Sequence, residues 1–451
     1  MRIYEPPANP ELTPLYLSAT DGGIEHSIEN DPRMFWNSFV YNLLLSEGGV
    51  VIPDVFFFNC RYLIQHLSGE AAWPLLLDAL RQGLAIPAFR SEQTTNFTQA
   101  LTEIGVEGVL GVEFDQYQQW RTTPHAVARR LDEAVTTGDK PTRIVWPPDM
   151  GGRFDRFMRQ ILERDSLPAA MSEEQEDLWR AIEPWRERTL ARAVTLTEEK
   201  GGTGLRRAEM WNALGLELGL LDPGGSFPKP RDLVRTVERR HDPATARRVS
   251  FYVDVVNAAY QKNQADAFQV LNNALSPLSP TAMSLFAGIG SGRAGLPSSI
   301  TMDVRLPSAS RLLAVESDRL LGIRESGPGK NFFAKRRSWM TNKSPQLDGM
   351  LADEMRQAAV QYGNALSALA GGPDYYAKMV AFSSVAGAAL VEEVKAVVDL
   401  MKDTQDLSPY YSLVVGSMSA AMMAMVLYRP PTRRLPVTVT RQAAPEINFP
   451  R

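Results

Sequence analysis

Hydrophobic and polar positions follow two different periods in the first 150 residues. Short apolar runs of strand length alternate with segments in which apolar residues recur every three to four positions, the spacing of one helix face. The strand-like runs are residues 48–58, 83–89 and 106–114. The helical patterns cover residues 31–47, 61–69, 71–83 and 123–138. Strands that alternate with helices in this way predict an α/β domain over residues 1–150.

The second section, residues 151–305, is dominated by the helical period. A segment rich in proline and glycine, residues 139–153, reads as the connector that leads into it. The helical patterns of this section are residues 152–165, 172–201 and 242–275. Their spacing predicts a mainly helical domain.

The third section, residues 306–430, is predicted to be a second helical domain. Its helical patterns begin with residues 308–323 and 344–372, and a basic segment, residues 324–343, is predicted to form a loop between them. A helix hairpin over residues 373–429 follows, and the proline-rich tail, residues 431–451, is predicted to be extended. The predicted fold class is therefore mixed α/β and predominantly helical, with an N-terminal α/β section, a helical body and a C-terminal close-packed helix hairpin.

The second helix of this hairpin contains the longest uncharged apolar run of the chain, residues 410–428. The run is long enough to cross a bilayer, and arginines follow it. It is rich in methionine, alanine, serine and glycine rather than leucine, and small residues four positions apart form one smooth ridge, which also suits a buried helix of a soluble core. The core helix is the favoured interpretation, and membrane insertion is the alternative.

Composition narrows the classes of protein that fit. The net charge of −4 gives no global attraction to nucleic acid or anionic lipid, so such binding would need a local patch. The single cysteine, Cys60, excludes a disulfide framework within the chain and fits a reducing, cytoplasmic location. The N-terminus lacks the apolar segment of a signal peptide, and the excess of arginine over lysine is typical of bacterial coding.

Carboxylates near two strand-like runs are the candidate catalytic residues. Asp54 follows the first run, and Glu113 and Asp115, two positions apart, would share one face of a strand. Together they could hold Mg²⁺, and this pattern predicts a phosphodiesterase or nuclease. The residues loosely resemble the Pro-Asp…(Asp/Glu)-x-Lys pattern of restriction-endonuclease-like proteins, but Asp115 stands where that pattern has lysine. The alternative interpretation is a helix cap at Asp54 and a solvated strand edge.

The basic segment, residues 324–343, is the candidate binding site. Cationic side chains neutralise phosphates and aromatic rings stack on bases, so their combination favours nucleic acid, another polyanion or a protein partner. The candidate binding residues are Arg324, Lys330, Phe332, Phe333, Lys335, Arg336, Arg337 and Trp339. The alternative interpretation is a solvated loop whose aromatic residues anchor it to neighbouring helices.

The leading functional hypothesis is a bacterial cytoplasmic protein that acts by binding, as a component of a larger assembly or response system. Its partner would bind through residues 324–343. The Mg²⁺-dependent nuclease is the first alternative, and a membrane-acting effector that uses residues 410–428 is the second. No Walker, zinc-protease or nucleophile-elbow motif is present, and the sequence indicates no cofactor or metal apart from the Mg²⁺ of the nuclease hypothesis. It leaves the oligomeric state open.

Overall fold

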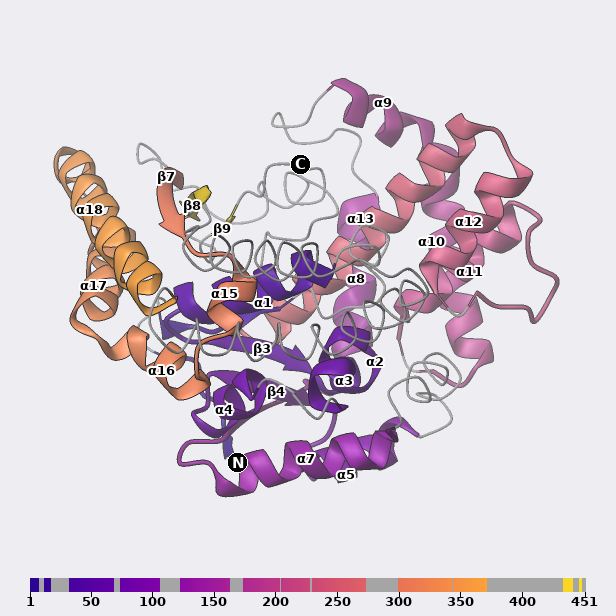
Figure 1. Cartoon of the computed structure of the whole chain (residues 1–451). Helices are drawn as coiled ribbons and strands as arrows, with labels where there is room; N and C mark the ends of the chain where they lie inside the picture. The colour runs from indigo at the N-terminus through magenta and orange to yellow at the C-terminus, as the bar shows by residue number, and fades with distance from the viewer. Residues whose placement is uncertain are drawn as a thin grey trace, which may run out of the picture.

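The computed structural model describes most of the chain from residue 1 to residue 370 and two short strands near the C-terminus (Figure 1). The described residues are 1–7, 12–17, 32–68, 74–105, 122–162, 173–202, 204–227, 229–272, 299–342, 344–370, 433–440 and 446–447. They form a mixed α/β, predominantly helical fold, which confirms the predicted fold class. The predicted helix hairpin, residues 373–429, lies outside the described residues.

A parallel sheet organises the N-terminal section. Its six strands run in the spatial order β1-β5-β4-β3-β2-β6, and all of their pairings are parallel. The strands are β1 (Arg2–Ile3), β2 (Leu15–Tyr16), β3 (Val50–Pro53), β4 (Ala85–Phe89), β5 (Thr142–Val145) and β6 (Leu271–Asn272). Every residue of β3 and β4 is buried, which explains why these strands are continuous apolar runs without alternation.

Strand β5 corrects the sequence analysis. It lies inside residues 139–153, which the sequence analysis interpreted as a connector, and it pairs with β4 through Ala88 opposite Ile144. The strand has only four residues, and prolines flank it on both sides, so the turn signal outweighed a very short apolar signal. The predicted strand-like run at residues 106–114 lies outside the described residues.

Helices cover both faces of the sheet. Helix α1 (Pro32–Leu45) lies on one face, whereas α5 (Phe97–Ile104) and α7 (Pro124–Thr137) lie on the opposite side with α4 (Leu75–Arg81) (Figure 1). Two further helices, α2 (Asp54–Asn59) and α3 (Arg61–Ser68), follow β3 directly. The long apolar run at residues 48–58 is therefore a strand that becomes a helix at Asp54.

The second section forms a helical lobe with its own hydrophobic core. Its helices are α8 (Met150–Leu162), α9 (Glu173–Ala181), α10 (Glu183–Glu199), α11 (Arg207–Glu217), α12 (Pro230–Arg240) and α13 (Pro243–Ala267). Asp242 caps α13, because its side chain accepts the Thr245 N–H, and Pro243 occupies the first turn. The helix ends earlier than the sequence pattern predicts, and Gln269, with φ of 55°, turns the chain into β6.

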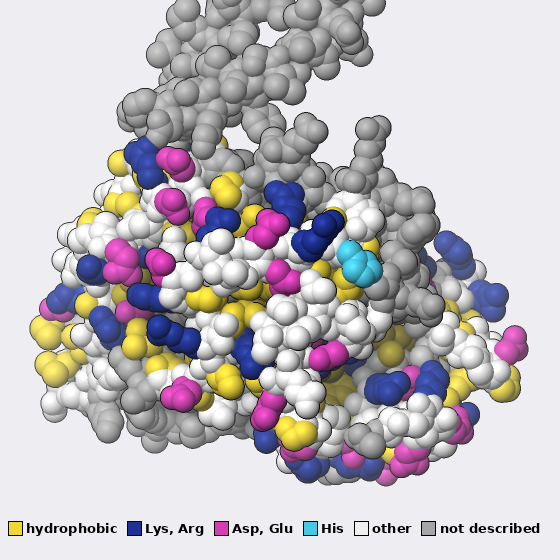
Figure 2. All heavy atoms as spheres, turned by 90° about the horizontal axis from the view of Figure 1, so that it is seen from below, with side chains coloured by type: hydrophobic (Ala, Val, Ile, Leu, Met, Phe, Trp, Pro, Cys, Tyr) yellow, Lys and Arg dark blue, Asp and Glu magenta, His cyan; other side chains and the backbone are white. Residues whose placement is uncertain are grey.

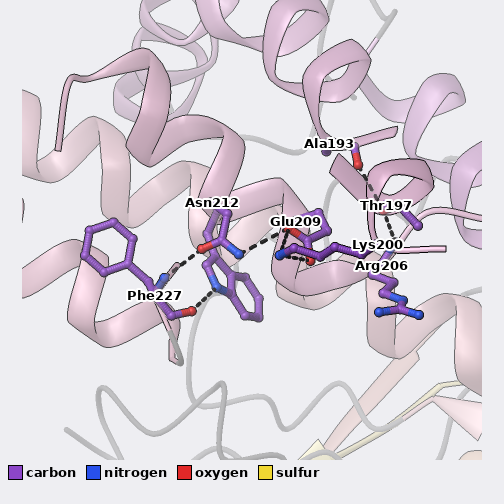
Figure 3. A network of polar contacts seen from close by, with 8 residues as sticks. Ala193, Thr197, Lys200, Arg206, Glu209, Asn212 and Phe227 are labelled. Atoms are coloured by element: carbon purple, nitrogen blue, oxygen red, sulfur yellow. Dashed lines mark hydrogen bonds and ion pairs between the residues drawn. The ribbon is translucent and has the colours of Figure 1, made fainter. Parts of the chain in front are cut away.

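The buried carboxylate of Glu209 accepts hydrogen bonds at the centre of a polar network in this lobe (Figure 3). Glu209 accepts hydrogen bonds from Lys200 Nζ at 2.9 and 3.0 Å and from Asn212 Nδ2 at 3.3 Å. Asn212 Oδ1 in turn accepts the Phe227 N–H at 2.8 Å, and the Trp211 indole donates to the Phe227 carbonyl. The network fixes the segment before α12 to α11, so its role is structural.

The third section packs on the N-terminal section rather than standing alone. Its described residues share one hydrophobic core with residues of the parallel sheet and its helices. The elements are β7 (Ser299–Leu306), α15 (Ala309–Leu313), α16 (Ser317–Gly322), the short helix η4 (Ile323–Glu325), α17 (Gly327–Thr341) and α18 (Pro345–Ala370). Strand β8 (Arg433–Thr440), from the predicted tail, pairs antiparallel with β7, and β9 (Glu446–Ile447) pairs with β8.

The predicted basic loop is wrong, because residues 324–343 are mostly helical. Helix α17 begins at Gly327, and the Ser326 side chain accepts the Gly329 N–H at 3.3 Å as an N-cap. Pro328 occupies the first turn, where its missing N–H costs nothing. The serine, glycine and proline that suggest a loop are thus the start signal of a helix.

Candidate functional site

Three residues that follow adjacent parallel strands define the candidate site. Asp54 follows β3, Arg90 follows β4 and Trp146 follows β5. Because β3, β4 and β5 are neighbours and parallel, their carboxyl ends meet at one edge of the sheet. Ligands of open α/β sheets bind outside this carboxyl edge, so it is the first place to look for a site.

Asp54 forms the buried end of this group. Its side chain is 0% exposed, and Oδ1 accepts the Val55 N–H at 2.6 Å and lies 3.4 Å from Arg90 Nε. The second oxygen, Oδ2, is buried and has no hydrogen-bond partner among the described residues. Burial raises the pKa of the Asp54 carboxyl above its usual range, although the Arg90 guanidinium and the backbone N–H groups of Val55 and Arg90 act in the opposite direction.

Arg90 forms the accessible end. Its side chain is 41% exposed, and its guanidinium lies 5.5 Å from the centroid of the Trp146 ring. Trp146 is itself fixed, because its indole donates to the Ala88 carbonyl at 3.0 Å and its ring packs on Phe268 at 5.7 Å. One edge of the guanidinium is therefore held by Asp54 and one face by Trp146. The described residues provide no hydrogen-bond partner for its two Nη atoms.

The C-terminal end of α13 connects this edge to the helical lobe. Tyr16, the last residue of β2, donates its hydroxyl to Gln264 Oε1 at 2.5 Å, and Gln264 Nε2 donates to the Tyr260 hydroxyl at 2.8 Å. The guanidinium of Arg207, from α11, lies 4.3 Å from the centroid of the Tyr260 ring. Contacts between polar and aromatic side chains thus continue from the sheet edge along α13 to Arg207.

Sequence analysis identified Asp54 but missed Arg90, Trp146 and Gln264. The sequence did contain a signal for Arg90, because Arg90 directly follows an apolar, strand-like run, as Asp54 does. Its importance depends on the pairing of β3 with β4, which is a long-range contact. Trp146 could be found only after β5 was recognised as a strand.

The structure brings together only part of the predicted magnesium site. Asp54 lies at the end of β3, but Glu113 and Asp115 lie outside the described residues. The charged group nearest to Asp54 among the described residues is Arg90, a cation. The described ranges contain no group of three metal-ligating side chains. The nuclease hypothesis stays a prediction.

The basic segment contains two buried arginines. Arg324 donates from Nη1 to the carbonyl of Leu43 and, at 2.8 Å, to that of Ser46, and from Nη2 to the carbonyl of Glu47 at 2.7 Å. These carbonyls lie at and just beyond the C-terminal end of α1, where helix carbonyls lack partners within the helix. Burial lowers the pKa of the Arg324 guanidinium.

Two further side chains complete this cap on α1. Arg336 is buried and donates from Nη1 to the Leu45 carbonyl at 3.1 Å, and the Tyr362 hydroxyl donates to the Leu44 carbonyl at 3.0 Å. The positive guanidinium groups also oppose the negative end of the helix dipole. Arg324 and Arg336 are therefore committed to internal contacts.

The aromatic residues of the basic segment belong to the hydrophobic core. Phe332, Phe333 and Trp339 are all buried, and the ring of Phe332 stacks on that of Tyr362 at 5.5 Å. In these positions they stabilise the packing of α17 on α18, and their faces are not presented to a nucleic-acid base.

Three cations in the part of the segment that the structure describes are at least partly exposed, and each has an acidic partner. Lys330 lies 3.6 Å from Glu325, Lys335 lies 2.8 Å from Glu354, and Arg337 lies 3.6 Å from Glu47. The prediction of a partner-binding segment stays a prediction, and among the described residues of the segment it now rests on Lys330, Lys335 and Arg337.

Charge is mixed on the face of the molecule that carries α5 and α7. Figure 2 shows Lys and Arg side chains interspersed with Asp and Glu side chains there, without a broad area of one sign. This face offers no extended surface for a polyanion.

Comparison with protein-family models, curated proteins and solved structures gives no match to this chain. Of the helices that the structure describes, none has the length and apolar character needed to cross a membrane. The apolar run at residues 410–428 lies outside the described residues.

Proposed function

We propose that the protein acts by binding a small anionic molecule at the carboxyl edge of its parallel sheet, and that Arg90 contacts the anion. The observation that carries the proposal is the arrangement of Arg90. Its guanidinium is accessible and fixed on two sides, and the described residues leave both Nη atoms without a partner. Fixed arginines recognise carboxylates and phosphates through two parallel hydrogen bonds.

The energetics of the ion pair between Asp54 and Arg90 support a functional rather than a structural role for it. An arginine side chain has about 2 kcal/mol of rotamer entropy to lose when it is fixed. Asp54 is fully buried, so its charge has lost its solvation, and a single contact of 3.4 Å with a partly exposed cation compensates poorly for that loss. Such a pair contributes little to the stability of the fold, but it positions Arg90.

Location supports the same proposal. Arg90 lies beside the ends of three neighbouring parallel strands, the part of α/β folds at which small molecules bind. We place this binding activity in a reducing cytoplasm, because the only cysteine of the sequence, Cys60, is buried and has no second cysteine with which to form a disulfide within the chain. Participation in a larger assembly, in which the ligand is a signal to a partner, is part of the proposal.

The test is a comparison of two arginine variants. Arg90→Lys keeps a positive charge beside Asp54 but removes the planar fork that binds an anion through two hydrogen bonds. The matched control is Arg81→Lys, because Arg81 is 39% exposed and pairs with Asp78, but it precedes β4 and lies at the opposite edge of the sheet. Phosphate, citrate, acetate and AMP are the anions to be titrated.

We expect at least one of these anions to bind the wild type. Its dissociation constant should increase about tenfold in Arg90→Lys and stay unchanged in Arg81→Lys. Equal binding by the wild type and Arg90→Lys would overturn the proposal.

A further inference from the structure

In the candidate site, a hydrogen-bond acceptor of Asp54 and hydrogen-bond donors of the adjacent Arg90 both lack partners among the described residues. Asp54 Oδ2 is a buried acceptor without a donor among the described residues, and the Nη atoms of Arg90 are donors without an acceptor there. The two groups are in contact, since Asp54 Oδ1 lies 3.4 Å from Arg90 Nε. Buried polar atoms in folded proteins nearly always have a partner, so an unpaired carboxylate oxygen points to a group that binds it.

We infer that the ligand is a free α-amino acid, whose carboxylate binds Arg90 and whose ammonium group binds Asp54 Oδ2. This inference rests on the proposed function, because it assigns the anion at Arg90 to a carboxylate. The two groups of an α-amino acid are attached to one carbon, and the two side chains that would receive them are in contact through Asp54 Oδ1 and Arg90 Nε. The ammonium group supplies N–H donors, and the carboxylate supplies two acceptors.

Charge balance favours a zwitterion over a simple anion. Arg90 and Asp54 form a neutral pair, and an amino acid is neutral as well, so each of the four charges in the complex has an opposite neighbour. A simple anion supplies the carboxylate or phosphate that Arg90 binds but leaves the buried Asp54 carboxylate without a cationic partner, so it should bind more weakly than an amino acid. Arg90 is accessible to a ligand, whereas Asp54 Oδ2 is buried, so contact with the ammonium group requires the side chains over Asp54 to move aside.

The test compares amino acids with the acids that lack the amino group. The pairs are glycine with acetate, L-alanine with propionate, L-leucine with isocaproate and L-phenylalanine with hydrocinnamate, each titrated into the wild type by calorimetry. Glycine betaine, which keeps the positive charge but has no N–H, is a further probe. The variant is Asp54→Asn, with its melting temperature recorded to confirm folding.

We expect at least one amino acid to bind about tenfold more tightly than its partner acid, and glycine betaine to bind no better than acetate. The advantage of the amino acid should disappear in Asp54→Asn. If Asp54→Asn does not fold, the wild-type pairs and glycine betaine still decide the question.

Two results would overturn the inference. One is equal affinity of the wild type for amino acids and their partner acids, and the other is an amino-acid preference that survives in a folded Asp54→Asn. If simple anions bind and depend on Arg90, the proposed function stands and only the assignment of the ligand is wrong. If no anion depends on Arg90, both fail.

Discussion

The guanidinium of Arg324 donates to the carbonyl of Leu43 across a sequence separation of 281 residues. This hydrogen bond joins the third section of the chain to the C-terminal end of α1, the helix that covers one face of the parallel sheet. Arg336 and Tyr362 donate to the two following carbonyls, so side chains from α17, α18 and the short helix before them cap α1. Two of the six cationic residues at 324–343 therefore have a structural role.

Arg336→Glu should unfold or strongly destabilise the protein. The new carboxylate would be buried beside carbonyl oxygens at the negative end of a helix, at a cost of about 3–5 kcal/mol. Lys335→Glu is the matched control, because Lys335 is the adjacent residue and is partly exposed, and it should cost about 1 kcal/mol or less. Urea denaturation measures both. Similar losses in the two variants would contradict the assignment of Arg336 to the core.

Asp254, a residue of α13 in the helical lobe, should make stability depend on pH. Burial raises its pKa to about 7, so the folded state binds a proton between about pH 4 and pH 7 that the unfolded state releases. Stability from this group is therefore fully present below about pH 4 and is lost progressively as the pH rises from there to about 7. Asp254→Asn should remove this dependence and stabilise the protein by about 1–3 kcal/mol at alkaline pH.

The measurement is urea denaturation of the wild type and Asp254→Asn at about pH 5 and about pH 8. The difference between the two proteins should be larger at the higher pH. An equal difference at both values would show that Asp254 does not titrate in this range.

Sequence pattern predicted the long helices well, because their start signals are local. The Thr123–Pro124 and Asp242–Pro243 pairs each place a capping side chain before a proline in the first helical turn, and α7 and α13 begin there. The same type of signal at Ser326 was misread, because glycines on both sides of Pro328 favoured a loop.

The parallel sheet was harder to predict than the helices. Its two central strands, β3 and β4, are apolar runs that the sequence analysis recognised, whereas β5 is short and β1, β2 and β6 have only two residues each. Such strands are defined by pairing with distant residues and carry almost no local signal. The contact of Asp54 with Arg90 depends on strand pairing. Sequence analysis could therefore identify Asp54 as a site residue but not Arg90.

The ion pair between Lys200 and Glu209, shown in Figure 3, should stabilise the helical lobe. Lys200→Met leaves the buried Glu209 carboxylate without a cation, and we expect a loss of about 3 kcal/mol in the free energy of unfolding. Glu209→Gln keeps the size and the hydrogen bond to Asn212 and removes the charge, so it should cost less. Thermal denaturation of the two variants at neutral pH compares these costs, and a larger loss in Glu209→Gln would contradict the account.

The central claim is that Arg90 binds an anionic ligand at the carboxyl edge of the parallel sheet. The most direct measurement is calorimetric titration of the wild type, Arg90→Lys and Arg81→Lys with the anion that binds the wild type most tightly. We expect a dissociation constant about tenfold higher in Arg90→Lys and an unchanged value in Arg81→Lys. Equal affinity in all three proteins would contradict it.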